Sequence, residues 1–269
     1  MDRDSIRSSF RALHVEGTFV MPNPHDLGAC RLLASLGFEA LATTSSGFAA
    51  SLGRPDMSVG RDQLVGHVRA LCGATDLPVS VDAERCFPDS PGGVVETVEL
   101  LAEAGAAGCS IEDWKPDSGE IEAVTVAVER VGLAAAAADR LGLTLTARAE
   151  NHLRGRDDLA DTITRLAAYA AAGAHCVYAP GLADLAAIAR VVEESGAPVN
   201  VLLRPDGPTV SELAGVGVRR ISVGGALAWI AYGALVRAAE QLLESGSLGP
   251  EAPYLSRATA HRAFAANRT

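Results

Sequence analysis

The chain has 269 residues, a formal net charge of −10 and 48% hydrophobic residues, with only 4% aromatic residues. An acidic protein is a poor nucleic-acid partner, because phosphate recognition needs a basic surface. A small anionic substrate is not excluded, since it responds to the local field. No apolar run approaches the roughly 18 residues that span a bilayer, which argues against a membrane partner. Five scattered cysteines without a Cys-x-x-Cys pair or a secretory start predict reduced thiols in the cytoplasm.

Eight short apolar segments alternate with helical patterns along the chain, and this alternation predicts parallel βα units. The predicted strands are Thr18–Met21, Ala40–Thr43, Val79–Asp82, Gly108–Ile111, Thr144–Arg148, Cys176–Tyr178, Val199–Leu202 and Arg220–Val223. The length alone allows one large barrel or two small domains. Eight βα units without a linker or a shift in composition favour one domain over residues 1–269, a TIM-like (β/α)8 barrel.

Helical periodicity and glycine punctuation support these units. Three of the predicted helices are Val94–Ala104, Asp158–Ala172 and Ala183–Glu194. Glycines after the last helical turn predict left-handed caps at Gly37, Gly105, Gly142, Gly173 and Gly196. A long helix, Leu227–Leu243, follows the eighth strand. The apolar tail after it, Pro250–Asn267, is expected to form a helix that packs on another part of the assembly.

Two segments are longer than barrel geometry requires, and both leave the carboxyl ends of strands. They are Thr44–Gly60 after the second strand and Trp114–Glu120 after the fourth. We expect both to be functional loops, because long loops in compact domains usually bind ligands or move.

Three acidic residues, Asp82, Glu84 and Glu112, stand where neighbouring predicted strands end. The carboxyl ends of the strands line the reaction centre in barrels of this kind. A single acid there is most often an ordinary loop residue, but three together favour a metal site. Oxygen-only ligands suit Mg²⁺, with Mn²⁺ as an alternative.

Other strand-end residues predict a site for an anionic substrate. Arg148 ends the fifth strand and can grip a carboxylate with two hydrogen bonds, although an internal salt bridge to Glu150 or Glu112 is the alternative. Glu150 follows it as a second substrate-site residue. The tripeptide Ser45-Ser46-Gly47 offers backbone N–H groups in a tight turn that could cradle an anionic oxygen, or it is a common turn.

Three weaker signals allow two interpretations each. Gly224-Gly225 after the eighth strand resembles a phosphate-binding start of a helix, but simple turn geometry is favoured. His152 could be an acid/base group or, more simply, a loop residue. His25 could take part in the site or only precede a helix.

The order of the motifs resembles a known family over about residues 10 to 245. The matching stretches are Phe19–Pro24, Gly37–Gly47, Leu52–Asp56, Val81–Glu84, Ala104–Asp113, Ala147–Glu150 and Val218–Gly224. Together they are similar to the isocitrate lyase / phosphoenolpyruvate mutase superfamily, specifically its smaller phosphoenolpyruvate mutase-like members.

This resemblance implies a TIM-like barrel whose last helix is exchanged between subunits of a homodimer or homotetramer. It implies Mg²⁺ held directly by Asp82, with Glu84 and Glu112 acting mainly through bound waters. The substrate's pyruvyl carboxylate would meet Arg148 and the backbone amides of Ser46 and Gly47, and Asp56 would lie near the reacting atoms.

The chain also departs from the family pattern. The Lys-Lys-Cys-Gly-His loop of the lyase branch is absent, and residues 114–120 contain neither cysteine nor histidine. The Lys-Thr-Asn loop of phosphonate mutases is absent as well. Arg85-Cys86-Phe87 replaces the glycine-tyrosine-glycine that often follows the metal carboxylates. An ordinary isocitrate or methylisocitrate lyase is therefore not expected.

The favoured function is a Mg²⁺-dependent carbon–carbon lyase acting on a small 2-oxo or 2-hydroxy carboxylic acid through an enolpyruvate-type intermediate. The alternatives are a C–P mutase or hydrolase on a phosphonopyruvate-like substrate and a non-catalytic barrel that binds a small acid. The expected proton donors are, in order, Lys115, Asp56, Glu150 and His152. Lys115 comes first because it lies in a loop that could close over the site.

Overall fold

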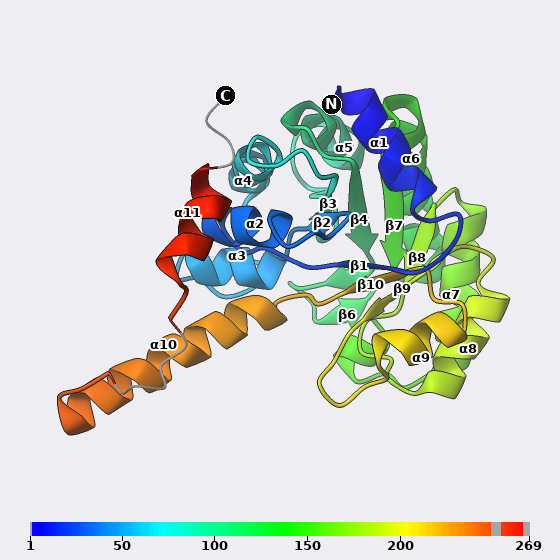
Figure 1. Cartoon of the computed structure of the whole chain (residues 1–269). Helices are drawn as coiled ribbons and strands as arrows, with labels where there is room; N and C mark the ends of the chain where they lie inside the picture. Colours follow the sequence, from blue (N-terminus) through cyan, green and yellow to red (C-terminus); the bar gives the residue numbers. More distant parts are fainter. Residues whose placement is uncertain (1, 249–253, 266–269) are drawn as a thin grey trace.

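The computed structural model describes residues 2–248 and 254–265 as an eight-stranded parallel sheet curled into a nearly closed barrel (Figure 1). Its strands are β1 (Phe19–Met21), β2 (Leu41–Ala42), β3 (Val79–Asp82), β4 (Gly108–Glu112), β7 (Thr144–Arg148), β8 (Cys176–Tyr178), β9 (Val199–Leu202) and β10 (Arg220–Ser222). They are hydrogen-bonded in the order β1-β10-β9-β8-β7-β4-β3-β2. The predicted TIM-like barrel and all eight predicted strands are confirmed, with ends that differ by at most one residue.

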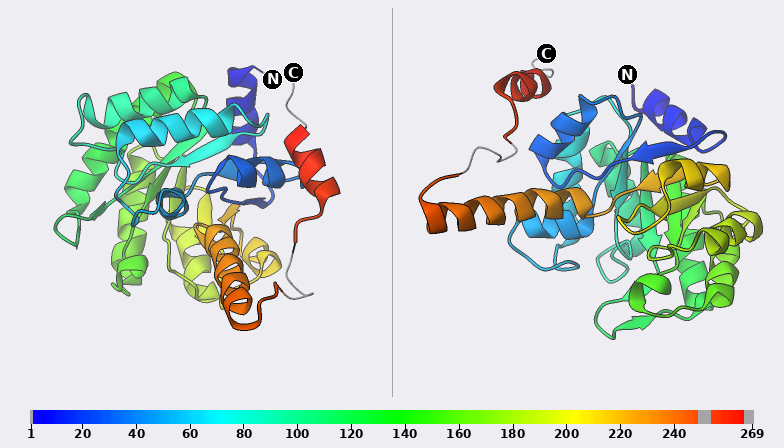
Figure 2. Two further views of the ribbon diagram at one scale, coloured as in Figure 1. Left: turned by 90° about the vertical axis from the view of Figure 1, so that its left-hand side faces the viewer. Right: turned by 60° about the horizontal axis from the view of Figure 1, so that its bottom comes forward.

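Helices surround the barrel, as the three views in Figures 1 and 2 show. They are α1 (Arg3–Ala12), α2 (Leu27–Ala34), α3 (Ser45–Ser51), α4 (Arg61–Cys72), α5 (Gly93–Ala104), α6 (Val124–Leu141), α7 (Leu159–Ala171), α8 (Leu185–Glu194), α9 (Val210–Gly215), α10 (Ala226–Ser245) and α11 (Arg257–Ala265), with a short 3-10 turn η1 (His152–Arg154). The five glycines predicted to cap helices all have positive φ, between 72° and 106°. That prediction is confirmed.

Alternation along the strands separates the core from the site. Residues facing the helices, such as Val81, Ile111 and Leu145, are fully buried in one large apolar cluster. Their neighbours along each strand face the barrel interior and are mostly polar, for example Ser80 and Ser110. Since successive strand residues point to opposite faces, the same strands supply both the core and the site.

The two segments predicted as long loops contain regular structure. Residues 45–51 form helix α3, which begins at the N-cap Thr44, whose hydroxyl accepts from the Gly47 N–H. Residues 114–121 form an antiparallel hairpin of β5 (Trp114–Lys115) and β6 (Glu120–Ile121). The loop predictions were wrong in this respect, although both segments do leave the carboxyl ends of strands.

The carboxyl-terminal helices differ in how they contact the barrel. The long helix α10 starts beside α3 and then extends away from the barrel (Figure 1 and the right view of Figure 2). Helix α11 lies against α2, where the Arg31 Nη1 donates to the Phe264 carbonyl at 3.3 Å. The rest of the predicted tail helix, residues 250–253 and 266–267, lies outside the described residues. No helix in the described ranges has the length and apolar character to cross a membrane.

Candidate active site

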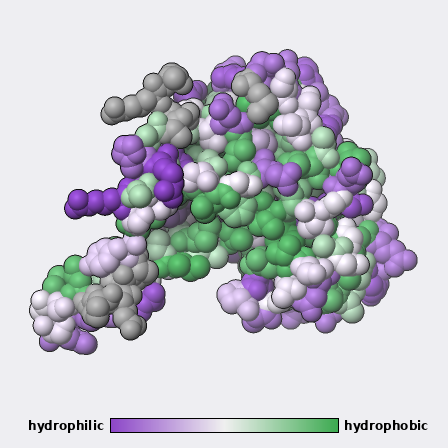
Figure 3. All heavy atoms as spheres, viewed as in Figure 1, coloured by the Kyte–Doolittle hydropathy of each residue, from purple (hydrophilic) through white to green (hydrophobic). Residues whose placement is uncertain are grey.

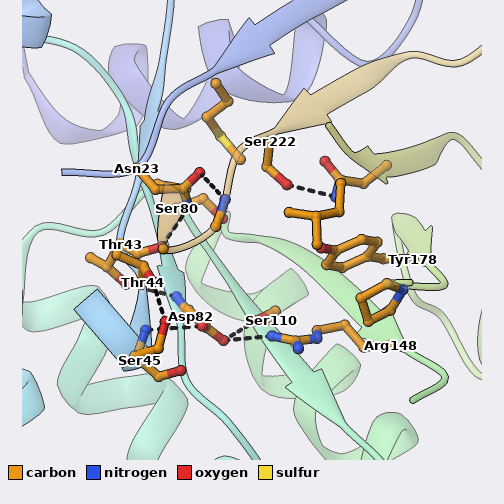
Figure 4. A pocket seen from close by; sticks show the side chains of 18 of the residues that line it. Asn23, Thr43, Thr44, Ser45, Ser80, Asp82, Ser110, Arg148, Tyr178 and Ser222 are labelled. Atoms are coloured by element: carbon orange, nitrogen blue, oxygen red, sulfur yellow. Dashed lines mark hydrogen bonds and ion pairs between the residues drawn. The ribbon is translucent and has the colours of Figure 1, made fainter. Parts of the chain in front are cut away.

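A cavity of about 290 Å³ opens among the carboxyl ends of the strands. Its lining comes from strand interiors and from the loops that follow, and Figure 4 shows many of these side chains directed toward one another. The lining residues include Asn23, Thr43, Thr44, Ser45, Ser46, Asp56, Ser80, Asp82, Ser110, Arg148, Tyr178, Asn200, Arg220, Ser222, Gly224 and Gly225. Five of the predicted site residues, Ser45, Ser46, Asp56, Asp82 and Arg148, are therefore brought together.

Asp82 and Arg148 form the centre of this arrangement (Figure 4). The Arg148 Nη1 donates to the Asp82 Oδ1 at 2.8 Å, and the Ser45 N–H donates to the Asp82 Oδ2 at 3.1 Å. Arg148 also pairs with Glu112 at 3.2 Å and Glu150 at 2.9 Å. The Arg148 Cζ lies 5.3 Å from the centre of the Tyr178 ring. The internal salt bridges predicted as the alternative for Arg148 are present, together with a third to Asp82.

The acids around Arg148 outnumber the cations. Glu112 is almost fully buried, and its Oε1 has no hydrogen-bond partner. Burial and the negative charge of Glu150 raise the pKa of Glu112 well above its ordinary value. Burial, with the charges of Asp82 and Asp56, raises the pKa of Glu84 to about 8. Both carboxyls therefore favour the protonated form in the protein alone, and a bound cation would stabilise their ionised form.

Glu84 is held by an unusual backbone. Its φ is 51°, in the left-handed region, and its carbonyl accepts from the Glu112 N–H at 2.9 Å. Cys86 and Phe87 also have positive φ, 56° and 45°. Residues other than glycine rarely adopt this conformation, and such strain gathers at functional sites.

The backbone of Glu150 is held by Asp113, which itself forms a buried ion pair with Arg165. The Glu150 N–H donates to the Asp113 Oδ1 at 2.9 Å. The Asp113 Oδ2 in turn accepts from the Tyr169 hydroxyl at 2.7 Å and from the Arg165 Nη1 at 3.2 Å. Glu150 thus reaches the site through Arg148, and it lies outside the cavity lining.

The tripeptide predicted to cradle an anion is the first turn of α3. The Ser45 N–H is taken by Asp82, and the Gly47 N–H by the Thr44 hydroxyl at 3.3 Å. Within the described part of the chain, the Ser46 N–H has no acceptor. A helix N-terminus presents such N–H groups to anions. Gly225 allows the close approach, because a Cβ there would lie 2.7 Å from the Ser46 Oγ.

The proposed proton donors Asp56, Lys115 and His152 lie in different places, and so does His25, which was considered only as a possible site residue. Asp56 borders the cavity and accepts from the Met57 N–H at 3.0 Å. Lys115, in strand β5, lies outside the cavity lining. His152 is in η1 and faces Asp157 at 3.4 Å. His25 precedes the α2 N-cap and packs against Tyr232, with ring centres 5.8 Å apart.

The residues fit a hard divalent cation by their chemistry. Asp82, Glu84 and Glu112 supply only oxygen, and the Glu112 Oε1 has no hydrogen-bond partner among the described residues. The raised pKa values of Glu84 and Glu112 show that their ionised forms lack enough compensating positive charge, which a cation would supply. Across the described residues, no three His, Cys, Asp or Glu side chains are arranged as a ready set of ligands. Mg²⁺ usually keeps several waters and takes one or two carboxylates directly, so a complete protein cage is not required.

Several cavity residues were not singled out from the sequence. They belong to the strands themselves, either as the last residue or two residues before it: Ser80, Ser110, Tyr178, Asn200, Arg220 and Ser222. The available signal was the period-two alternation of polar and apolar residues within each strand.

Comparison with known proteins identifies the family of the chain. The family model described as "Phosphoenolpyruvate phosphomutase" matches residues 10–243. A solved Burkholderia cenocepacia J2315 protein, described as a candidate lyase/mutase, is 48% identical with a TM-score of 0.93, covering 98% of this chain and 97% of that one. An uncharacterized Mycobacterium tuberculosis protein is 32% identical over 91% of both chains.

A third relative has a named activity. Oxaloacetate decarboxylase 2 of Pseudomonas putida W619 is 30% identical over 82% of this chain and 74% of its own. The sequence resemblance stated above is thereby confirmed. The chain belongs to the phosphoenolpyruvate phosphomutase family, and it shares its fold with 2,3-dimethylmalate lyase, a solved member of the PEP mutase/isocitrate lyase superfamily, at 23% identity and a TM-score of 0.84.

Proposed function

We propose that the protein is a Mg²⁺-dependent lyase that makes or breaks a carbon–carbon bond in a small 2-oxo or 2-hydroxy carboxylic acid through an enolpyruvate-type intermediate. The observation that carries the proposal is the acid group beside the cavity. Asp82 lines the cavity and pairs with Arg148, Glu112 pairs with Arg148 as well, and the charge of Asp82 helps to raise the pKa of Glu84. The relative named oxaloacetate decarboxylase supports carbon–carbon chemistry on an oxo acid.

In this proposal Asp82 holds the cation directly, and Glu84 and Glu112 hold its waters. The cation, when bound, would draw negative charge from the oxygen atoms of the acid as the bond changes. Arg148 and the Ser46 N–H orient the carboxylate, which saves orientational entropy. Asp56 moves the proton, because it borders the cavity. Lys115 would take that role only if the β5–β6 hairpin closed over the site.

The second candidate is C–P chemistry on a phosphonopyruvate-like acid, and the family's phosphomutase description favours it. The two functions release different products. Purified full-length protein with Mg²⁺ or Mn²⁺ should therefore be assayed for pyruvate, carbon dioxide and inorganic phosphate on a panel of oxo acids, hydroxy acids and phosphonates. Carbon–carbon products support the lyase, and phosphate or rearranged phosphonate supports the second candidate.

Asp82→Asn tests the metal role in the same assay. The amide keeps the shape and can still accept from the Ser45 N–H, but it loses the charge. We expect the fold and melting temperature to be kept and metal-dependent turnover to be lost. Undiminished turnover in this variant would show that Asp82 does not hold the cation. If no acid is bound or converted by the wild-type protein, the non-catalytic alternative replaces the lyase.

We also propose a homodimer or homotetramer, with α10 as the contact. All five cysteines are unpaired, which fits a reducing compartment such as the cytoplasm.

A further inference from the structure

Arg220 is a buried cation at the deep end of the cavity. It starts β10, two residues before the strand ends at Ser222, and its side chain is 3% exposed. Its Nε donates to the Asn200 Oδ1 at 2.9 Å, and its Nη2 donates to the Thr146 Oγ1 at 2.8 Å. Its Nη1 lies 3.4 Å from the His14 Nε2. These contacts fix the guanidinium against the wall of the barrel.

None of these partners is negative. Asn200 and Thr146 are neutral, and burial followed by the charge of Arg220 lowers the pKa of His14 to about 3. Among the described residues, no Asp or Glu forms an ion pair with Arg220. Arg148, by contrast, contacts three carboxylates. Burying a charge is costly unless it is paired, so an anion bound in the cavity beside Arg220 would be stabilised by its charge.

The guanidinium is also accessible from the cavity. Arg220, Asn200 and Ser222 all line it, and the Asn200 Nδ2 donates to the Ser222 Oγ at 3.0 Å. A guanidinium has five N–H donors, and the contacts above use three. Strand register runs from Arg148 through Tyr178 and Asn200 to Arg220. The two arginines therefore stand three strands apart around one cavity, and Figure 4 shows Ser222 and Arg148 on different sides of it.

We infer that Arg220, Asn200 and Ser222 form a second anion subsite, the floor subsite, which binds one carboxylate of a small dicarboxylic acid while Arg148 and the Ser46 N–H hold the other. This inference rests on the proposed function, in which the cavity binds a small acid. A carboxylate is the favoured ligand because its two oxygens match the planar fork of arginine. An inorganic anion such as sulfate shares this chemistry, and the test separates the two.

Asn200→Asp is the sharpest test. The new carboxylate has the shape of the amide, lies 2.9 Å from the Arg220 Nε and supplies the missing counter-charge from within the protein. A purely structural role of Arg220 would be preserved or strengthened. An anion subsite would be lost. Gln63→Glu is the matched control, because it adds the same charge beside Arg54, a surface arginine that donates to Gln63 at 2.9 Å.

Calorimetric titration of the full chain in Mg²⁺ with succinate, pyruvate and sulfate gives the readout. We expect wild-type and Gln63→Glu proteins to bind succinate more tightly than pyruvate, and sulfate to compete with succinate. Asn200→Asp should weaken succinate binding at least about tenfold, the effect of losing one charged hydrogen bond. It should leave pyruvate binding within about threefold and should not lower the melting temperature. Arg220→Gln should also weaken succinate binding at least about tenfold, with a lower melting temperature because it removes the buried contacts to Thr146 and His14.

Three results would overturn the floor subsite. One is an Asn200→Asp variant that keeps the preference for succinate. Another is an equal loss of succinate and pyruvate binding, which would indicate a general effect on the cavity. The third is sulfate binding that does not compete with succinate, which would place the anion elsewhere. If the wild-type protein binds neither acid, it is the proposed function that fails.

Discussion

At the scale of single residues, the site is organised by how each charge is compensated. Arg148 is surrounded by Asp82, Glu112 and Glu150, whereas Arg220 has only neutral partners. In the low-dielectric interior, charges interact more strongly than in water. The excess of carboxylates around Arg148 and the lack of a counter-charge beside Arg220 therefore both have larger energetic effects. The acidic group near Arg148 therefore favours a cation, and the surroundings of Arg220 favour an anion.

Asp56 borders the cavity and Lys115 does not, so a pair of substitutions can show which of the two donates the proton. We expect Asp56→Asn to lower kcat about 10²-fold, the usual contribution of a general acid or base. Lys115→Ala should lower it less than about tenfold, because Lys115 lies outside the cavity lining. Steady-state kinetics on the best substrate decides the matter. A larger loss for Lys115→Ala would mean that the hairpin brings this lysine over the site.

His14 makes stability depend on pH. Its folded-state pKa is lowered to about 3 by burial and by Arg220, with smaller contributions from His175 and Arg11. Below about pH 6.5 His14 therefore binds a proton in the unfolded chain but not in the folded chain. The free energy of unfolding falls as the pH falls. Between pH 7 and pH 4 this amounts to about 3 kcal/mol.

His14→Gln removes the titrating group at this position. Urea unfolding at pH 7 and pH 4 should show that the variant loses about 3 kcal/mol less than the wild type over this interval. His67, whose pKa burial lowers to about 4, remains in both proteins and cancels in the comparison. Equal losses in the two proteins would show that His14 is protonated in the folded state.

The residues at strand ends were predictable, because parallel strands bring their carboxyl ends to one edge of a barrel. This reasoning placed Asp82 and Arg148 in the site, and the family resemblance placed Asp56 there. It missed Asn200 and Arg220, because a polar residue inside a short strand does not reveal whether it faces a cavity or a neighbouring side chain. Side-chain contacts that depend on tertiary packing, such as that of Arg220 with His14, leave no local signal.

At the scale of elements, the barrel depends on how its two edge strands meet. The strand and helix boundaries followed from apolar periodicity and glycine caps, but α3 and the β5–β6 hairpin did not. Helix α3 consists largely of serine, alanine and glycine, and its start is set by the Thr44 cap. Strands β1 and β2 share no ladder pairing, and the Ala42 N–H donates to the Pro22 carbonyl at 3.0 Å between them.

Asn23 closes this seam. Its Nδ2 donates to the Thr43 carbonyl at 2.7 Å, and its Oδ1 accepts from the Val223 and Gly224 N–H groups at 2.9 and 3.0 Å. Asn23→Ala leaves three backbone groups without partners, so we expect a loss of about 2 kcal/mol or more in the free energy of unfolding. Amide exchange should accelerate at Val223 and Gly224 and stay slow in β4 and β7. Uniform acceleration over all strands would contradict a local seam.

At the scale of the whole molecule, α10 is incompletely packed in the single chain. Ala228 is its one buried residue, while Ile230 is 63% and Leu235 64% exposed. Trp229, Val236 and Leu243 are exposed as well. Figure 3 shows a broad hydrophobic area on the viewed face beside the start of this helix. Contiguous apolar surface of this kind usually marks a protein interface. A second copy of the chain is the proposed partner, since a closed dimer would cover the same face on both subunits.

Charges placed on α10 test this assembly. Wild-type protein should elute as a dimer or tetramer in size-exclusion chromatography with light scattering. Ile230→Glu with Val236→Glu should give monomers, because two desolvated carboxylates would oppose burial of the face. The control is Leu133→Glu with Val126→Glu, which changes two exposed apolar residues on α6, 54% and 46% exposed, by the same charge. A control that dissociates equally, or an α10 variant that stays assembled, would place the subunit contact elsewhere on the barrel.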